Sequence, residues 1–483
     1  MLLWPVVRLL ILFSGALSLT MLFPLLAALV FREETMVWSF GITIAAVLAV
    51  SLPVFIFSKK QKTGFIANEA ILLVCLAWIT AGFLGAVPYY LSGFMRPYSG
   101  AVFESISGFT STGTTIIPNP EILPRSFLLW RGMTQWLGGM GMVVLAAAFV
   151  PLLGAGGFHL LKTETTGPGK EKFTPRMTAM AKRLALIYAG LTVTMTALLM
   201  LGGMGWLDAV THAFSVLGTG GFSSKNAGAA AWNSPYIEWV FIVFMLIAGF
   251  NLTLICRLLQ GRPGEIIRNS EAKAYAAIIM AAALFVAAQL MPHVGSLGKS
   301  LRFAFFDVVS IMSTTGFMLD NHNQWPYPAQ FVVFVLMLIG GCSGSAAGGV
   351  KVVRYVILFK QTKNELFRNL YPKGVFSIQM DGRSGRKDMV GHAGSFFCLY
   401  AAMIALGTLL VSSAGAGLYD SLNAALLTVG NIGVGFGKLA SGAIFYETPG
   451  YVKWGLSVLM LAGRLEIFTF IVLFHPEFWK NNF

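Results

Sequence analysis

The chain has 483 residues, of which 56% are hydrophobic and only 11% are charged. Soluble domains carry about 25% charged residues, so the composition indicates an integral membrane protein and excludes a separate soluble domain. The net charge is +14, but with Met1 inside, 24 of the 34 Lys and Arg residues fall in inner loops and 9 in outer loops. This bias is the positive-inside signal, and it argues against nucleic acid as a partner.

The first two apolar runs, residues 9–31 and 37–57, predict a helical hairpin that occupies residues 1–66. The first run is longer than the roughly 7–15 residues of a signal-peptide core, so we interpret it as a retained anchor. Three lysines close the hairpin on the inner side (Lys59, Lys60 and Lys62). The four cysteines show neither metal-site spacing nor a disulfide framework, and we expect them to be packing residues (Cys75, Cys256, Cys342 and Cys398).

The remaining chain repeats one plan four times: a span, a half-length helix, a short polar strip and a second span. A full crossing needs about 20 apolar residues, which places spans near 70–92 and 128–153, 184–203 and 236–258, 274–292 and 328–360, and 389–411 and 450–474. The half-length helices are predicted near 99–109, 207–217, 301–312 and 418–429. The repeats occupy residues 67–158, 159–262, 263–387 and 388–483, and every strip enters from the outer side.

The polar strips share a short run of Thr, Ser or Asn followed by Gly. They read FESISGFTSTGTT (103–115), FSVLGTGGFS (214–223), VVSIMSTTGFM (308–318) and LTVGNIGVGF (427–436), with the shared glycines at Gly113, Gly220, Gly316 and Gly433. A polar strip between two spans is tolerated only where it lines water or is buried in protein. One strip alone is typical of helix packing or a loop, but four in equivalent positions predict a fourfold pseudo-symmetric pore.

Such strips suit a cation. A pore must replace the hydration shell of a cation with oxygens, which rings of backbone carbonyls provide and hydroxyls supplement. Glycine permits backbone conformations that expose carbonyls, and short helices ending at the strips direct their negative C-terminal dipoles to the same point. The predicted fold is therefore an all-α integral membrane protein, with an N-terminal hairpin and four span–pore helix–filter–span repeats around a central pore.

The second span of the third repeat contains GGCSGSAAGGVK (340–351). The small-xxx-small spacing of its glycines is compatible with close helix packing. Five glycines in ten residues, however, each cost a helix roughly 0.5–1 kcal/mol relative to alanine. Ser343 and Ser345 can hydrogen-bond the freed backbone, so we favour a broken helix with a flexible loop.

Arg464 lies within the apolar stretch 451–474, where a charge is costly and faces a cavity or a partner. Glu466 is two residues away and would not share its helix face. One interpretation is a structural ion pair, with Glu104 or Asp307 as the partner, and the other is an electrostatic barrier beneath the strips. The half-length helices also carry acidic residues (Glu104, Asp208, Asp307 and Asp420), which either cap the helices or attract cations to the outer mouth.

The four strips, together with GGCSGSAAGGVKVVR (340–354) and MLAGRLEIF (460–468), resemble the Trk/Ktr/HKT superfamily of potassium transporters over nearly the whole chain. The resemblance is greatest to the bacterial Trk-type K⁺ uptake membrane subunit. It implies a K⁺-translocating homodimer in the bacterial inner membrane, with a cytoplasmic N-terminus and cytosolic RCK-type nucleotide-binding regulatory subunits. No cofactor is expected on this chain, and K⁺ is the transported ion.

Carried over to this sequence, the resemblance implies a filter made of three residues from each strip: Ser111, Thr112 and Gly113; Gly218, Thr219 and Gly220; Thr314, Thr315 and Gly316; and Asn431, Ile432 and Gly433. No strip matches TVGYG, and the fourth departs furthest. Family members that pass Na⁺ well often have serine at the first glycine, so Gly113 favours K⁺. The implied gate combines the loop with two basic side chains: Gly340, Gly341, Ser343, Gly344, Ser345, Gly348, Gly349, Lys351 and Arg464.

Two other classes of function fit this sequence less well. A membrane enzyme is disfavoured because the six histidines form no HExxH pattern and no Walker or nucleotide-binding motif appears. A coupled K⁺–H⁺ or K⁺–Na⁺ symporter would use inverted repeats and midplane carboxylates, whereas these four units run in the same orientation. The inner loops 159–183, 257–273 and 360–388 are predicted connectors and candidate docking surfaces.

Overall fold

The computed structural model describes residues 3–58, 67–153, 173–381, 383–384, 388–433, 435–436 and 443–480. The described chain is almost entirely helical, and a two-stranded hairpin, β1 (Gln379–Met380) with β2 (Arg383–Ser384), is a small departure from the predicted all-α fold. Within these residues, six helices are long and apolar enough to cross a membrane, and eight crossings result if two sharply bent helix pairs each count as one span. The protein is an integral membrane protein.

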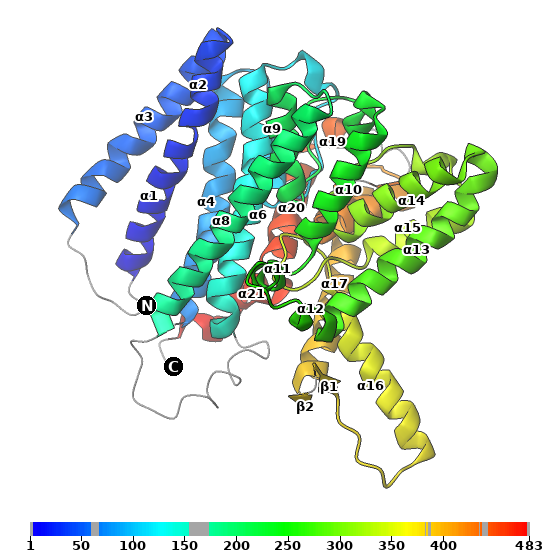
Figure 1. Cartoon of the computed structure of the whole chain (residues 1–483). Helices are drawn as coiled ribbons and strands as arrows, with labels where there is room; N and C mark the ends of the chain where they lie inside the picture. Colours follow the sequence, from blue (N-terminus) through cyan, green and yellow to red (C-terminus); the bar gives the residue numbers. More distant parts are fainter. Residues whose placement is uncertain are drawn as a thin grey trace.

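The N-terminal hairpin lies at one edge of the helical bundle (Figure 1). Its first predicted span is α1 (Leu3–Thr20) followed by α2 (Leu22–Val30), and its second is α3 (Glu34–Phe57). Helices α1 and α3 pack on α4 (Ala67–Leu91), and α2 packs on α6 (Arg125–Leu153). Much of the surface of α3 is exposed and apolar, as expected for a helix in contact with lipid.

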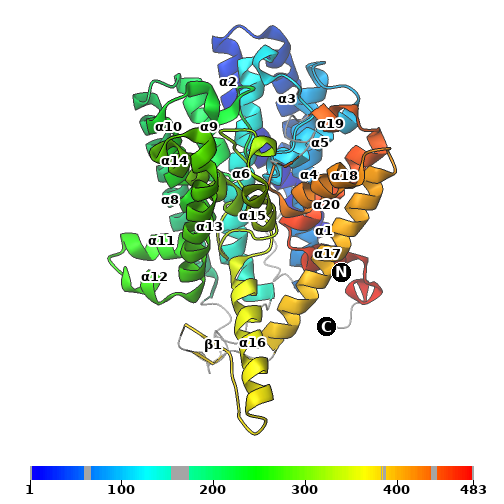
Figure 2. The same cartoon turned by 90° about the vertical axis from the view of Figure 1, so that its right-hand side faces the viewer.

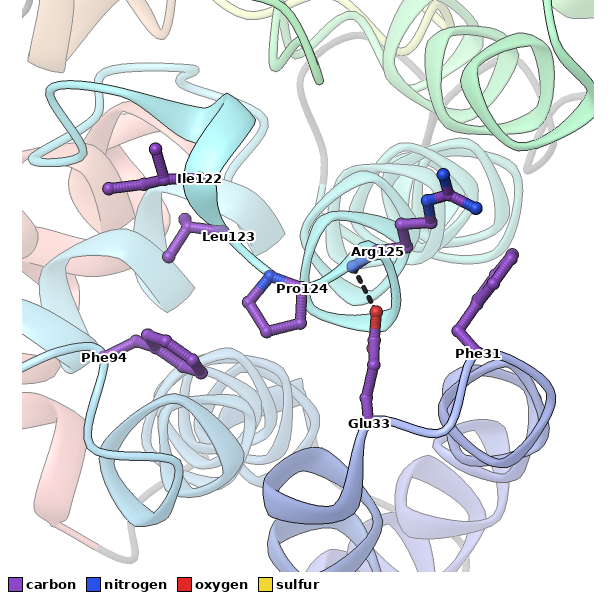
Figure 3. Close-up of a pocket in the computed structure, with 7 residues that line it drawn as sticks. All are labelled: Phe31, Glu33, Phe94, Ile122, Leu123, Pro124 and Arg125. Carbon is purple, nitrogen blue, oxygen red and sulfur yellow. Dashed lines mark hydrogen bonds between the residues drawn. The ribbon is translucent and has the colours of Figure 1, made fainter.

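A single carboxylate attaches the turn of this hairpin to the first repeat (Figure 3). Glu33 accepts hydrogen bonds from the backbone N–H groups of Arg125 (2.7 Å) and Ser126 (3.0 Å), which begin α6. The Arg125 guanidinium lies 4.8 Å from the centre of the Phe31 ring, at the pocket beside this contact. Because the first N–H groups of a helix have no partner within it, Glu33 caps α6 from a distant part of the chain.

Each repeat contains a long first helix and a half-length helix, as predicted. The first repeat has α4, α5 (Tyr98–Phe109) and α6; the second has α8 (Phe173–Leu201), α9 (Trp206–Leu217), α10 (Pro235–Gly249) and α11 (Leu252–Leu259). The third has α12 (Gly264–Arg268), α13 (Ser270–Val294), α14 (Leu297–Met312), α15 (Tyr327–Met337) and α16 (Val352–Leu370). The fourth has α17 (Asp388–Ser412), α18 (Leu418–Gly430), α19 (Ala443–Glu447), α20 (Gly450–Arg464) and α21 (Ile467–Ile471).

The repeats close into a ring because two packing rules recur in every unit. The half-length helix packs on the first long helix of its own unit, in the pairs α4–α5, α8–α9, α13–α14 and α17–α18. It also packs on the second span of the preceding unit, in the pairs α6–α9, α10–α14, α15–α18 and α20–α5. The last of these pairs joins the fourth unit to the first, so the four half-length helices surround a common centre.

Two second spans that were predicted to be continuous are broken. In the second unit, α10 and α11 meet at 103° around Phe250 and Asn251, and Asn251 caps α11 through bonds from the N–H groups of Thr253 (2.9 Å) and Leu254 (3.3 Å). In the fourth unit, α20 and the helical segment that begins at Ile467 meet at 119°. Arg464 is therefore the last residue of α20, and the expectation that it lies inside a continuous span is wrong.

Both chain ends lie on the side of the bundle from which α16 protrudes (Figures 1 and 2). The segment that contains α11 and α12 also lies towards this side, at the edge of the bundle (Figure 2). The basic segments 257–273 and 360–388, which were predicted to be loops and are partly helical, thus share a side with the termini, in agreement with the charge bias of the sequence. Residues 59–66 and 154–172, which include the predicted lysine cluster and most of one inner loop, lie outside the described residues.

Candidate functional site

The four polar strips have the same backbone conformation. Each has a first residue in the left-handed region, at Ser111 (φ 53°), Thr219 (φ 55°), Thr314 (φ 56°) and Asn431 (φ 52°). Two residues later each has a left-handed glycine, at Gly113 (φ 81°), Gly221 (φ 78°), Gly316 (φ 79°) and Gly433 (φ 81°). Such φ values strain most side chains but not glycine, and Asn tolerates them better than most residues, so Asn431 leaves the backbone of the fourth strip unchanged.

The second strip is shifted by one residue from its predicted register. The equivalent triplet is Thr219-Gly220-Gly221, because Thr219 and Gly221 hold the two left-handed positions. Gly218 instead precedes the triplet, as the C-cap of α9. Because Gly220 and Gly221 are adjacent, the sequence is compatible with either of them as the last residue of the triplet.

The strips meet in a closed ring through close backbone approaches. A Cβ atom on Gly113 would lie 1.9 Å from the carbonyl oxygen of Gly220, and one on Gly221 would lie 2.3 Å from that of Thr315. A Cβ on Gly316 would lie 2.1 Å from the oxygen of Ile432, and one on Gly433 would lie 2.7 Å from that of Thr112. Each glycine thus faces the middle residue of the next strip, and only a residue without a side chain fits there.

The hydroxyl groups of the strips bond to protein atoms. Thr112 Oγ1 lies 2.7 Å from Thr110 Oγ1 and accepts from Asn431 Nδ2 (2.8 Å). In the third strip the equivalent pair, Ser313 Oγ and Thr315 Oγ1, is also 2.7 Å apart. These bonds connect the hydroxyls of the first and third strips to neighbouring side chains.

Gln135 is a site residue that the sequence reasoning missed. From α6 it donates through Nε2 to the carbonyl of Gly220 (2.7 Å) and accepts through Oε1 from the N–H of Phe222 (3.2 Å). Its side chain occupies the space where a Cβ on Gly220 would fall. A buried glutamine within the predicted span 128–153 was the available signal, because a polar side chain at that depth needs partners.

Two acidic residues of the half-length helices do not have either of their predicted roles. Glu104 and Asp307 are fully buried in the middle of α5 and α14, so they neither cap a helix nor lie at an open mouth. Glu104 pairs with Arg131 (2.6 Å) and accepts from the N–H of Ile116 (3.0 Å), beyond the first strip. Asp307 Oδ1 lies 3.1 Å from His322 Nε2. The two carboxylates thus lie beside the segments that leave the first and third strips.

The other two acidic residues lie in the first turns of α9 and α18, where a negative charge favours a helix N-terminus. Asp208 also accepts from Ser224 Oγ (2.6 Å), beyond the second strip. Asp420 occupies the corresponding first turn in the fourth unit.

The segment between α15 and α16 forms an irregular loop, and the helix-packing alternative for residues 340–351 is wrong because these residues are not helical. The loop bonds to the break between α10 and α11: Cys342 N–H donates to Gly249 O (2.9 Å), Ala346 N–H to Ala248 O (3.3 Å), and Leu252 N–H to Gly344 O (3.3 Å). The carbonyls freed by one broken helix are thus satisfied by the loop of another.

Within the loop, the other predicted residues stabilise the turn itself. Gly340 N–H donates to Val350 O (2.8 Å), while Gly341 O accepts from Val352 N–H (3.2 Å). Ser345 Oγ donates to Cys342 O (2.6 Å), which confirms its predicted bond to freed backbone. Gly344 (φ 73°) and Gly349 (φ 67°) hold the loop's left-handed positions. Lys351 folds back so that Nζ donates to Ala347 O.

Arg464 is buried and makes none of the ion pairs predicted for it. Its guanidinium donates to Ala346 O (2.6 Å), Ser111 Oγ (3.2 Å) and Gly138 O (3.4 Å). The two proposed partners are already paired, Glu104 with Arg131 and Asp307 with His322. Arg464 therefore lies between the first strip and the loop, and the three oxygens that it bonds in the described part of the chain are neutral.

The first residue of every strip contacts this assembly of loop and arginine. Ser111 accepts from Arg464, Thr219 Oγ1 donates to Ala346 O (2.9 Å), and Thr314 Oγ1 accepts from Gly348 N–H (2.8 Å). A Cβ on Gly348 would lie 2.8 Å from Asn431 Cβ. The loop thus lies directly against one end of the ring, on the same side of the strips as Arg464.

Comparison with known proteins identifies the family of this chain. The TrkH family, described as cation transport protein, matches residues 39–280 and 277–481. The "Trk system potassium uptake protein TrkH" of Escherichia coli (strain K12) is 36% identical over 478 residues, covering 98% of both chains, and that of Vibrio parahaemolyticus is 33% identical over 483 residues, covering 99% of both. The crystal structure of the potassium transporter TrkH from Vibrio parahaemolyticus superimposes with a TM-score of 0.91 at 32% identity, covering 99% of this chain and 100% of that one. The chain belongs to the TrkH family of cation transport proteins.

Proposed function

We propose that this chain carries out K⁺ uptake through a channel-like path whose selectivity filter is the ring of four strips. The observation that carries the proposal is the closed ring, in which each left-handed glycine meets the middle carbonyl of the next strip. A similar protein from Escherichia coli is named a potassium uptake protein, and the similar crystal structure is titled as a potassium transporter. No step of chemical catalysis is needed for this function.

The proposed filter oxygens are backbone carbonyls, each of which has two lone pairs, so even the Gly220 carbonyl that accepts from Gln135 can face an ion. The strip hydroxyls Thr112 Oγ1 and Thr315 Oγ1 bond to neighbouring side chains. Carbonyl rings can replace the hydration shell of K⁺, and the C-terminal ends of α5, α9, α14 and α18 add negative dipole potential at the ring. The proposed filter residues are Ser111, Thr112 and Gly113; Thr219, Gly220 and Gly221; Thr314, Thr315 and Gly316; and Asn431, Ile432 and Gly433.

The loop at residues 340–349 is the proposed gate. Its contacts with the second, third and fourth strips support a position in the proposed ion path, and its small side chains and glycines permit a second, withdrawn arrangement. Deleting Ser343–Ala347 should raise K⁺ flux in the absence of a regulatory subunit and leave the K⁺/Na⁺ flux ratio nearly unchanged. A deletion variant that assembles and shows parental flux would refute the gate.

The protein is proposed to lie in the inner membrane of a bacterial cell. In this topology the strips are entered from outside, and the termini, α16 and the segment 257–273 face the cytosol. The positive-inside bias supports this orientation. The assembly is proposed to be a homodimer that binds RCK-type nucleotide-binding subunits on its cytosolic face. A regulator can move the gate only by binding its two arrangements unequally.

Ion flux in liposomes tests the function. The full-length chain is reconstituted, and K⁺, Na⁺ and H⁺ gradients are varied one at a time while the reversal potential is recorded. A K⁺-selective channel predicts a reversal potential that follows the K⁺ gradient and ignores the H⁺ gradient. A reversal potential that shifts with the H⁺ or Na⁺ gradient at constant K⁺ would instead show coupled symport, and an absence of any flux would refute ion transport by the chain alone.

A further inference from the structure

Glu271 holds the loop through a contact that is separate from those with the strips. It lies in the first turn of α13, only 6% exposed, and its Oε1 accepts from the N–H of Ser343 (2.7 Å) and from the N–H of Val353 (3.2 Å). Ser343 belongs to the loop, whereas Val353 lies in the first turn of α16. One carboxylate oxygen therefore connects the loop to the helix that follows it.

This contact is unusual among those that hold the loop. The bonds of the loop to α10 and α11 join backbone groups to backbone groups, and its partners at the strips and at Arg464 are hydroxyls and a guanidinium. Glu271 supplies a buried carboxylate, and one of its oxygens accepts from two N–H groups that are ten residues apart in sequence. A carboxylate at a helix N-terminus is also favoured by the helix dipole, so Glu271 caps α16 from another helix.

We propose that Glu271 is a positioning residue that latches the loop in its blocking arrangement by bonding Ser343 and Val353 together. The proposal rests on the proposed function of the loop as a gate. Withdrawing the loop while α13 stays in place leaves a buried carboxylate and buried N–H groups without their partners, and such groups are costly to leave unpaired. The latch therefore resists opening unless the N-terminus of α13 moves with the loop.

The N-terminus of α13 is itself tied to the β1–β2 hairpin. Asp381, in the turn of that hairpin, accepts from the N–H of Ser270 (2.7 Å), the residue before Glu271, and from Asn269 Nδ2 (3.2 Å). Asp381 is exposed and follows α16 in the loop 360–388. A displacement of the hairpin would thus be transmitted to Glu271 through the bond between Asp381 and the neighbouring residue Ser270.

The first readout is basal K⁺ flux of the full-length chain in liposomes, without a regulatory subunit. Glu271→Ala removes the acceptor and should raise flux about tenfold or more, the order expected from one hydrogen bond to a charged group. Glu271→Gln keeps an oxygen acceptor of the same reach and should stay close to the parent. Glu265→Ala is the matched control, because Glu265 is a partly exposed acid of α12 that pairs with Arg257 outside the loop.

The second readout reports loop position directly. Cys342 precedes Ser343 in the loop and is 1% exposed, so a polar maleimide should label it slowly in the detergent-solubilised parent. The other cysteines are first replaced, in a Cys75→Ala, Cys256→Ser and Cys398→Ser background. Glu271→Ala should speed the labelling of Cys342 by a factor similar to the rise in flux, whereas Glu271→Gln and Glu265→Ala should not.

The outcomes separate the latch from the gate. If deleting Ser343–Ala347 raises flux but Glu271→Ala changes neither flux nor labelling, the latch is refuted and the gate stands. Faster labelling without a rise in flux also overturns the latch, because the loop then loosens without opening the path. If the deletion leaves flux unchanged, the gate itself fails. Should Glu271→Ala not accumulate, Glu271→Asp withdraws the oxygen by one methylene, keeps the charge, and must raise both readouts.

Discussion

Removing the charge of Arg464 is expected to raise basal K⁺ flux strongly. Arg464→Met is the informative change, because methionine is unbranched and apolar and fills much of the same space. The guanidinium lies 3.2 Å from Ser111 Oγ, in the first strip. For an assumed separation of roughly 8 Å between the guanidinium and a K⁺ ion at the strip, two unit charges repel by about 2 kcal/mol at an effective dielectric of 20. Relief of that repulsion corresponds to roughly a 30-fold higher rate of passage.

The change also removes an anchor of the loop, and the two effects must be separated. Ala346 O loses its bond from Arg464 but keeps the one from Thr219 Oγ1 (2.9 Å), so the loop stays partly held. Arg464→Lys keeps the positive charge and loses the planar fork that bonds several oxygens at once. If the charge is the barrier, the lysine variant should remain within a few-fold of the parent while the methionine variant rises.

The assay is K⁺ flux in liposomes, normalised to the amount of folded protein, together with the K⁺/Na⁺ flux ratio. The ratio should stay constant because the filter carbonyls are untouched. Arg464→Met protein that folds normally and shows parental flux would refute the barrier. An equal rise in both variants would assign the effect to the lost anchor and not to charge.

Four further changes test the filter and its supports. Gly113→Ser should lower the K⁺/Na⁺ flux ratio at least severalfold, because its Cβ would lie 1.9 Å from a neighbouring carbonyl oxygen; Gly93→Ser, at φ 79° with open space around it, is the control and should not change the ratio. Gly221→Ser should lower the ratio as well, and a parental ratio would restore the register predicted from sequence. Arg131→Ala leaves a buried carboxylate unpaired and should cost roughly 3–5 kcal/mol, seen as a lower thermal midpoint in detergent; an unchanged midpoint contradicts the buried pair. Glu33→Ala removes a helix cap worth about 1 kcal/mol and should lower the midpoint by about one degree in a chain of this length without changing K⁺ flux, whereas altered flux would link the hairpin to the pore.

Properties that depend on short stretches of chain could be predicted from the sequence. The long and half-length helices follow from apolar run length, and their predicted positions agree with α5, α9, α14 and α18 to within a few residues. The interruption of the helix at 340–351 follows from its many glycines, because each glycine destabilises a helix through its own backbone and needs no distant partner. The four-unit plan could be recognised because each unit repeats the same order of run lengths and polar strips.

Properties that depend on contacts between distant segments were decided by the tertiary structure. The break after Gly249 contains no proline, and it is stabilised by loop residues about 90 positions later in the chain. The register of the second strip depends on which of two glycines meets the Thr315 carbonyl, since either glycine satisfies the local backbone. Arg464 and Glu271 bond mainly to backbone atoms of distant segments, and because nearly every residue carries the same backbone groups, no sequence pattern could identify those partners.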